Sequence, residues 1–320
     1  MLQKGTIATP RLDLGAALEE YPLAAPGLIG TQALPIFSTP KREGQYNTVT
    51  RESILRTRNV NRGANGSYSR DSFDTDVLEY ACKEYGHEQP LGDDQVQYYA
   101  SAFDAEMTAA SVARGVLLRE QEKRVAALFQ NVSSTGWYSS TAALYTNTDT
   151  DWDDITSLIV TDVDNAKEKV RINCGLPANT MIISAAVLPW LKKNTDIKAR
   201  LQYTNAITSD VIAGMLPSLF GIPKVLIAGG VYDSANEGQT MSLADVWSDN
   251  YAWIGVTATT NSIAEPCVGR TFLWSDDSAD NVTVEEYREE QTRSNIYRVR
   301  HHLVEKIQDL YFGHVLLIDT

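Results

Sequence analysis

The chain has 320 residues, of which 43% are hydrophobic and 22% charged, which is enough apolar material to bury one large core or two modest ones. Its formal net charge of −13 argues against a general nucleic-acid binder, because phosphate binding requires clustered Lys and Arg. The three cysteines are scattered without a Cys-x-x-Cys spacing, so neither a disulfide framework nor a zinc site is indicated.

Nothing in the sequence indicates secretion or a membrane. Residues 1–9 lack a signal-peptide pattern, and the longest apolar run, Met181 to Leu191, is too short to span a bilayer. We expect a soluble, unsecreted protein made in a reducing cytosol.

Residues 1–40 combine prolines and glycines with no sustained period, which predicts an extended N-terminal arm. Its many Leu, Ile, Tyr and Phe residues favour docking on another surface over a free tail. A loose, flexible terminus is the alternative.

Residues 41–70 are basic, with seven Lys and Arg against two Glu, a local net charge of +5. Strand-forming residues in Tyr46–Leu55 and Thr57–Val60, around a turn at Arg62–Ser67, predict a long two-stranded loop. We call residues 41–76 the extended loop. A hairpin this polar is not stable by itself and needs a partner.

An acidic belt follows, in which Lys83 is the one basic residue among ten acids between Asp71 and Glu106. Loop and belt could pair within one subunit or between subunits, where opposite potentials set register. Two solvated charge runs are the alternative. The candidate inter-subunit contact residues are Arg51, Arg56, Arg58, Arg62, Arg70, Asp71, Asp74, Asp76, Glu79 and Glu84.

A single long helix is predicted from Asp93 to about Phe129. Apolar residues recur there at steps of three and four, and Asp93 and Asp94 suit the helix start. Roughly 35 residues at about 1.5 Å each give a rod on the order of 50 Å. Ala, Gly and Arg interrupt the heptad seam that a coiled coil requires, so we favour a beam under a flat domain. The apolar stripe is Val96, Tyr99, Phe103, Met107, Ala110, Leu117, Val125 and Leu128.

After short strands and turns in 132–150, a second helix is predicted from Asp151 to about Asn173, with Gly175 just past its end. Strands and helices then alternate, which predicts a compact α/β unit of about 130 residues. Its strands are expected at 180–184, 224–228, 252–258 and 270–274, its helices at 185–193, 196–203 and 209–220, and a polar loop at 234–250.

The end of the chain reads as strands. Val282, Val284 and Tyr287 alternate with polar residues, and Ile296 to Asp319 is rich in β-branched and aromatic positions. We predict that these strands return to the sheet beside the long helix, so that one domain is discontinuous. The fold class is therefore α+β.

The sequence carries few signs of a catalytic or metal-binding site. No phosphate loop, Gly-x-Gly-x-x-Gly or Gly-x-Ser-x-Gly motif is present, and Gly229-Gly230 reads as a turn. His301, His302 and Glu305 form a metal-like cluster, but on a strand the two histidines face opposite sides. His301 and Glu305 are then roughly 13 Å apart, too far to ligate one ion.

A run of acids starting at Asp149 is similar to a calcium loop, but Asp154 replaces the required glycine and Val160 the required glutamate. We therefore expect no metal, cofactor or catalytic residue, and no enzyme.

The order of these predicted segments resembles the order found in the major capsid protein of tailed bacteriophages, whose shell-forming fold is shared with encapsulins. The local likenesses are Pro177–Ile183 leading into a helix, Leu219–Pro223 before Val225–Ile227, Val246-Trp247 before Tyr251–Trp253, and Gly269–Trp274 ahead of the Val282–Arg288 strand.

The resemblance implies a phage capsid/encapsulin-like fold. Residues 1–40 would be the N-terminal arm, 41–76 the extended β-hairpin loop, and 77–150 the peripheral domain with its spine helix at 93–130. Residues 151–279 would be the α/β axial domain, and 280–320 the returning strands of the peripheral domain. Some relatives cross-link their shells through a loop lysine, but Lys41 lies at the loop base, so we do not carry that chemistry over.

The implied function is that of a structural major capsid protein that assembles through pentamers and hexamers into an icosahedral shell around viral double-stranded DNA. Its expected partners are itself, a portal, a scaffolding protein that is separate or already cleaved, decoration proteins, and packaged DNA by non-specific proximity. Its expected location is the virion, after assembly in the host cytoplasm. The alternatives are an encapsulin-type nanocompartment shell and an α/β small-molecule enzyme.

Overall fold

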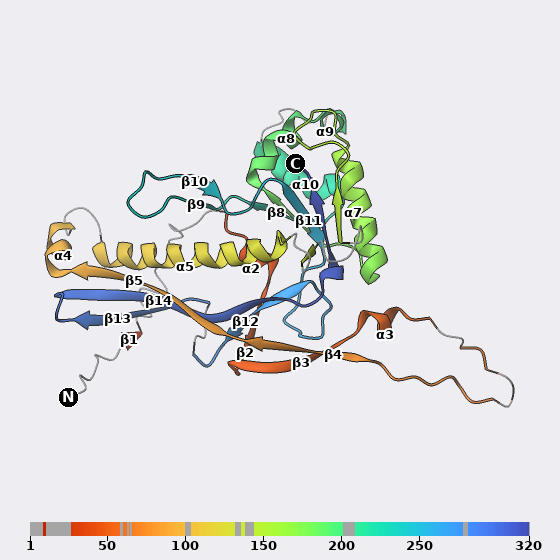
Figure 1. Ribbon diagram of the computed structural model, residues 1–320, viewed down its shortest axis with the longest axis horizontal. Helices are drawn as coiled ribbons and strands as arrows, with labels where there is room; N and C mark the ends of the chain where they lie inside the picture. Colours follow the sequence, from red (N-terminus) through yellow and green to blue (C-terminus); the bar gives the residue numbers. More distant parts are fainter. Residues whose placement is uncertain are drawn as a thin grey trace.

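A computed structural model describes residues 9–10, 27–57, 60–62, 64, 66–99, 104–131, 136–137, 144–200, 209–277 and 281–319. One flat part of the molecule consists of a sheet with a long helix along it, and a second body of strands and helices stands at one end of that helix (Figure 1). The extended loop projects away from both parts.

The flat part is built on a six-stranded sheet whose central strand is β14 (Ser294–Ile307). Along one edge β14 pairs with β5 (Lys83–Gly92), and along the other it pairs first with β13 (Thr283–Glu289) and then with β12 (Gly269–Trp274). β2 (Ile36–Thr39) extends the sheet beside β12, and β1 (Thr9–Pro10) beside β13. Segments from both ends of the chain thus share one sheet.

The long helix α5 (Ala105–Phe129) lies on this sheet, in contact with β5 and β14. Its buried face is rich in small residues, including Ala109, Ala110, Ala113 and Gly115, which lets the helix backbone approach the strands closely. Alanine is also the strongest helix former, so the same residues favour the helix and its packing.

The prediction of one continuous helix from Asp93 was wrong. Asp93–Tyr99 forms a separate short helix, α4, and α5 has its own start. Oδ1 of Asp104 accepts hydrogen bonds from the backbone N–H groups of Glu106 and Met107, 3.1 and 3.2 Å away, while Asp104 itself has an extended backbone. The 25 residues of α5 span about 38 Å.

The second body contains a five-stranded sheet in the order β6 (Tyr145–Asn147), β15 (Gly313–Leu317), β11 (Tyr251–Gly255), β7 (Thr180–Ser184) and β8 (Lys224–Ala228). The predicted return of 296–319 to the sheet beside α5 was therefore wrong for β15, although it was right for β14. All five residues of β7 are buried, which agrees with its apolar centre at Met181–Ile183 and its position between two other strands.

Helices cover this sheet: η2 (Ala185–Val187), α8 (Leu188–Lys193), α9 (Thr195–Arg200), α10 (Ser209–Phe220) and α7 (Ile159–Cys174). α7 ends as predicted at Gly175, whose φ of 77° is the left-handed conformation that favours glycine. Its predicted start at Asp151 was wrong, because residues 152–156 form turns and a bend and α7 begins at Ile159.

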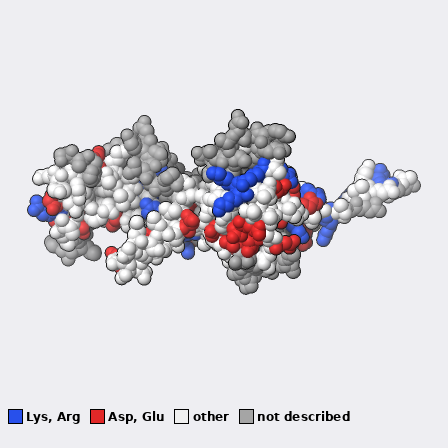
Figure 2. Space-filling model, turned by 90° about the horizontal axis from the view of Figure 1, so that it is seen from above, with Lys and Arg blue, Asp and Glu red and all other residues white. Residues whose placement is uncertain are grey.

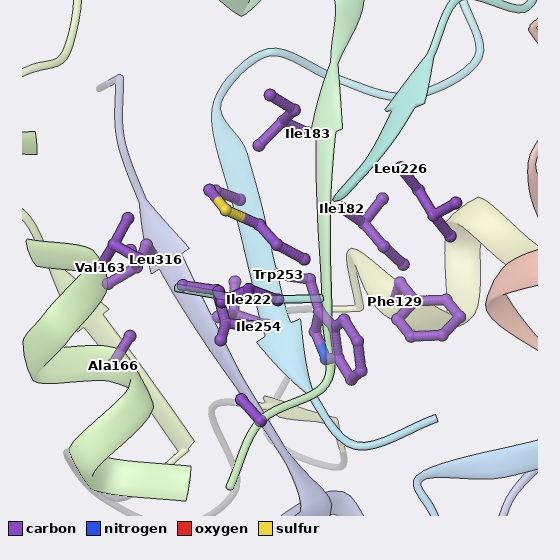
Figure 3. Close-up of a cluster of buried hydrophobic side chains, with 14 of the residues drawn as sticks. Phe129, Val163, Ala166, Ile182, Ile183, Ile222, Leu226, Trp253, Ile254 and Leu316 are labelled. Carbon is purple, nitrogen blue, oxygen red and sulfur yellow. The ribbon is translucent and has the colours of Figure 1, made fainter. Parts of the chain in front are cut away.

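The main core lies between α7, this sheet and the end of α5 (Figure 3). Val163 and Ala166 of α7 face Leu316 of β15, and Ile182, Trp253 and Phe129 continue the cluster toward α5 (Figure 3). The rings of Phe129 and Trp253 meet edge to face with centroids 4.8 Å apart. One continuous core therefore joins the second body to the long helix.

Two hairpins leave the compact parts. The extended loop begins and ends in β3 (Glu43–Val49) and β4 (Thr75–Ala81), with a short helix, α3 (Arg51–Leu55), between them. The predicted strand at Thr57–Val60 was wrong in its described residues, since the described residues from 56 to 74 form neither helix nor strand. The other hairpin, β9 (Val231–Asp233) and β10 (Leu243–Asp245), extends along α5 (Figure 1). β9 ends just before the stretch predicted as a polar loop, 234–250, and β10 lies inside that stretch, so the prediction of a loop without strands was wrong there.

Candidate assembly surfaces

The base of the extended loop is anchored to the six-stranded sheet by aromatic side chains. Tyr80 of β4 stacks on Phe272 of β12, with ring centroids 4.6 Å apart and planes within 6°, and Tyr46 of β3 packs on the same ring. The Tyr80 hydroxyl also shares a 2.9 Å hydrogen bond with Thr39. Phe272 is fully buried, so this end of the loop belongs to the core.

The distal part of the loop has no such core. Val60, Tyr68 and Phe73 are 80%, 70% and 72% exposed, high fractions for large apolar side chains. Arg62 organises the turn locally, because its Nε donates to the Gly66 carbonyl at 2.6 Å and its guanidinium lies 4.8 Å from the Tyr68 ring. These contacts of Arg62 therefore order the tip of the loop, while its large apolar side chains stay exposed to solvent, where a partner could bind them.

Where the loop passes the second body, α3 contacts α7. Nη1 of Arg51 donates to the Asn173 carbonyl at 3.0 Å, and the same guanidinium lies 3.7 Å from the centroid of the Tyr311 ring. Thr50 caps α3 by accepting from the backbone N–H of Ser53. Arg51, a predicted inter-subunit contact, thus has partners within its own chain.

The structure places the other predicted contact residues as follows. Arg56 and Arg70 are exposed on the loop, whereas Arg58 lies outside the described residues. Asp74 joins the two sides of the loop through its backbone, since its carbonyl accepts from Thr50 and its N–H donates to Ser53. Asp71, Asp76 and Glu79 are exposed, and Glu79 accepts a hydrogen bond from Gln45 across the hairpin.

Part of the acidic belt faces basic side chains of its own subunit. Asp93 pairs with Arg288 through two hydrogen bonds of 2.5 and 2.8 Å, and this contact holds the pKa of the Asp93 carboxyl below its ordinary value. Glu88 lies 3.8 Å from Arg298, and Glu84 lies 3.7 Å from His302. These three acids therefore face arginine and histidine of β13 and β14 in the same chain.

A buried carboxylate that the sequence analysis did not single out joins three parts of the fold. Glu122 of α5 is 2% exposed and accepts hydrogen bonds from the backbone N–H groups of Ile29 and Gly30 and from Nε1 of Trp247, at 3.0, 2.7 and 2.6 Å. Gly30 begins α2 (Gly30–Ala33). Burial raises the pKa of Glu122, and these hydrogen bonds oppose that rise. Glu122 stands three residues before Val125 of the predicted stripe, the signal that could have revealed its burial.

The histidine cluster adopts the predicted strand geometry. On the α5 side, His301 is fully buried against Tyr85, and Glu305, further along the same face of β14, binds Arg124 of α5 at 2.9 Å. On the opposite side, Nδ1 of His302 lies 2.5 Å from Oδ2 of Asp277. Burial, aided by the charge of Arg124, lowers the pKa of His301 to about 3, so the ring is neutral near pH 7.

Acidic and basic side chains gather in neighbouring patches on top of the second body (Figure 2). Asp151, Asp153 and Asp319 have carboxylate oxygens within 4.8 Å of one another. Exposed acids gather in this way without a metal, so this geometry alone assigns no ion. In the part of the chain that the structure describes, no helix has the length and apolar character that a membrane span requires.

Taken together, a long helix lying on an extended sheet, a separate α/β body at its end and a projecting β-hairpin loop define the shell-forming fold of phage capsid proteins and encapsulins. The resemblance inferred from the sequence is confirmed.

Comparison with known proteins gives particular relatives. No protein-family model matches the chain. The chain is 23% identical over 224 residues to the major capsid protein of Burkholderia phage BcepMu, a match that covers 69% of each protein.

Among solved structures, a phage-related protein from Bordetella bronchiseptica matches with a TM-score of 0.70 and 20% identity over 97% of both chains. The capsid of a native GTA particle matches with a TM-score of 0.57 and 13% identity over 96% of this chain and 99% of that one. An encapsulin from Synechococcus elongatus matches with a TM-score of 0.55 and 10% identity over 97% of this chain and 95% of that one. The likeness to these structures is one of fold.

Proposed function

We propose that this chain is a phage major capsid protein that assembles through pentamers and hexamers into an icosahedral shell enclosing double-stranded DNA. The observation that carries the proposal is the extended loop, which projects from the subunit with Val60, Tyr68 and Phe73 exposed. A segment with large exposed apolar groups and no core of its own requires a partner surface. In a shell of identical subunits, a second copy supplies that surface.

In this proposal the second body is the axial domain, which gathers at the local symmetry axes. The six-stranded sheet and α5 form the peripheral domain, and the extended loop reaches a neighbouring subunit. Arg56 and Arg70 are the loop charges that would face the neighbour, with Asp76 and Glu79 as acidic counterparts. Arg51 would instead fix the loop to its own subunit, because it binds Asn173 and Tyr311.

The role is structural and non-enzymatic in this proposal. The most perturbed buried groups have structural explanations: Glu122 ties α2 and Trp247 to α5, and His301 packs against Tyr85. The net charge of −13 suits a container wall that does not trap the DNA it encloses. A portal, a scaffolding protein and decoration proteins would complete the particle in the host cytoplasm.

An encapsulin-type compartment is the second candidate, because an encapsulin shares the fold with nearly the same TM-score as the GTA capsid. The sequence match to a phage major capsid protein favours the capsid.

The test is sizing by light scattering together with negative-stain imaging of the purified full chain. We expect rings of five or six subunits or closed shells. A protein that stays monomeric across salt, pH and concentration series would contradict the proposal. Shells isolated from the native host would contain DNA if the capsid proposal holds, and a cargo enzyme if the encapsulin candidate holds.

A further inference from the structure

The hairpin formed by β9 and β10 presents an outer face on which two apolar side chains alternate with two aspartates. Val231 pairs with Asp245 and Leu243 pairs with Asp233, so these four side chains share one face, while Tyr232 lies on the other. Nζ of Lys123 lies 4.6 Å from the centroid of the Tyr232 ring, so that second face is turned toward α5. On or beside the outer face, Val231, Leu243 and Met241 are 47%, 62% and 66% exposed, and we call these three the hairpin patch.

A second apolar surface lies where α3 meets the end of α7. Ile54 and Leu55 of α3 are 62% and 46% exposed, and Ile172 of α7 is 63% exposed. The Arg51 bond to the Asn173 carbonyl holds α3 against this end of α7. We call Ile54, Leu55 and Ile172 the helix patch. It has a fixed position on the second body although α3 belongs to the extended loop.

The charges around the two patches are opposite. Residues 231–249 contain Asp233, Glu237, Asp245 and Asp249 and no Lys or Arg. In the two segments that form the helix patch, residues 51–56 and 168–172, four bases outnumber two acids; they are Arg51, Arg56, Lys169 and Arg171 against Glu52 and Glu168. Asp74, which is bonded to Thr50 and Ser53, adds a third acid beside α3, so four bases against three acids leave a local net charge of +1. At the opposite end of α7, exposed Asp153 and Asp154 would repel the hairpin. The acids around the hairpin patch are therefore complementary to the bases around the helix patch. The hairpin would be attracted to the Cys174 end of α7 and repelled from the end near Asp153 and Asp154.

The two patches cannot cover each other within one chain, because the hairpin and α7 lie on opposite sides of the five-stranded sheet (Figure 1). We propose that the hairpin patch of one copy docks on the helix patch of the next copy around the same ring. Two different surfaces that meet head to tail form a heterologous interface, which generates a closed ring when the rotation between copies closes. This inference rests on the proposed shell function and names the surfaces that would form each ring.

The test is cysteine cross-linking in the assembled full-length protein. The double variant Leu243→Cys/Ile172→Cys, treated with a short bismaleimide, should give a ladder of covalent oligomers that stops at five or six subunits. Either single variant should give no ladder, because head-to-tail contact never brings two copies of one residue together. The native cysteines that the structure describes are buried, which limits background reaction.

The matched control is Val112→Cys/Ile172→Cys, because Val112 is 48% exposed on α5 and belongs to neither patch. An equal ladder from this control would overturn the inference. A charge-pair test is independent of cross-linking: Leu243→Asp should raise the concentration needed for assembly, and Leu243→Asp/Ile172→Lys should restore it.

The outcomes separate the two proposals. If the unmodified protein forms rings or shells but the double variant gives no ladder and the charge pair gives no rescue, the interface is wrong and the shell function stands. If the unmodified protein never assembles, the shell function itself is wrong.

Discussion

The five-stranded sheet buries its large apolar side chains, whereas the extended loop leaves its own exposed. In the sheet, Ile254 and Leu316 are buried between helices, and their neighbours in the chain complete the same core. In the loop, Phe73 is 72% exposed and the described residues around it form no helix or strand. The sheet is therefore stabilised by its own chain, whereas the loop is complete only against another surface. The base of the loop resembles the five-stranded sheet, because Tyr46 and Tyr80 pack on the buried ring of Phe272 in β12.

The largest effect on the isolated subunit is expected where the loop joins the core. Phe272→Ala removes a fully buried ring that Tyr80, Tyr46 and Phe37 all contact, and should lower the free energy of unfolding by roughly 3–5 kcal/mol. Chemical denaturation of the unassembled protein measures this loss. An unchanged midpoint would mean that the loop base is not part of the cooperative core.

Glu122→Ala should cost roughly 2–4 kcal/mol of unfolding free energy, because three buried N–H donors lose their acceptor. The matched control is Glu120→Ala on the same helix, where an exposed pair with Lys123 should contribute less than about 0.5 kcal/mol. Equal losses from both variants in the same denaturation assay would refute the role of Glu122 as a buried link.

Acid should destabilise the subunit through His301. Its pKa of about 3 in the folded state lies below the ordinary 6.5, so below pH 6.5 the unfolded chain binds a proton that the native state does not. Between pH 6.5 and 5 this lowers stability by about 2 kcal/mol. Denaturation midpoints across that range give the measurement.

Glu122 acts in the opposite direction, because its pKa is raised and its native carboxyl takes up a proton first as pH falls. The comparison that isolates the histidine is His301→Leu, which removes only the His301 contribution. The pH dependence of the variant minus that of the unmodified protein should show the expected slope, and identical slopes would exclude His301 as its source.

The smallest effect on the subunit should come from the tip of the loop. Phe73→Ser should change the free energy of unfolding of the monomer by less than about 0.5 kcal/mol, since the ring contributes little to the subunit's own core. The same variant should raise the concentration at which shells form, as followed by light scattering. A destabilised monomer, or an unchanged concentration for assembly, would contradict the view that Phe73 serves contact between subunits and not the subunit's own core.

Much of the second body was predictable because its signals are local, although the strand predicted there at 270–274 was wrong in its placement, since β12 lies in the six-stranded sheet. The strands at Thr180–Ser184 and Lys224–Ala228 and the helix at Ser209–Phe220 were predicted with the observed bounds. Gly221 and Pro223 separate the helix from the second of these strands, and Gly229 follows that strand. The glycine at the end of α7 was equally readable. The extended loop was predicted from its composition, and its pairing in β3 and β4 lies only partly within the expected strands.

What the sequence did not reveal depends on tertiary context. The apolar stripe continues through Val96 and Tyr99, so periodicity alone predicts one helix. The separate start of α5 depends on the cap formed by Asp104, which the spacing of apolar residues does not reveal. The placement of β15 depends on which sheet has room for another strand. The sequences of β14 and β15 both contain apolar residues, and they do not indicate that the two strands belong to different sheets. The inter-subunit role of the contact residues stays a prediction. Among them, Arg51 has partners in a distant segment of its own chain, and the same holds for Asp93 in the acidic belt, because charge runs do not show which distant residues fold against them.

The position of β15 makes the second body depend on a segment that reaches it from the other sheet. Gly313–Leu317 occupies an inner place in the five-stranded sheet, paired with β11 on one side and β6 on the other, and α7 packs on it. Release of this segment would open the sheet in its interior and uncover the face on which α7 packs. Because β15 follows β14 of the six-stranded sheet closely in the chain, a shift of β14 would be transmitted to the core of the second body.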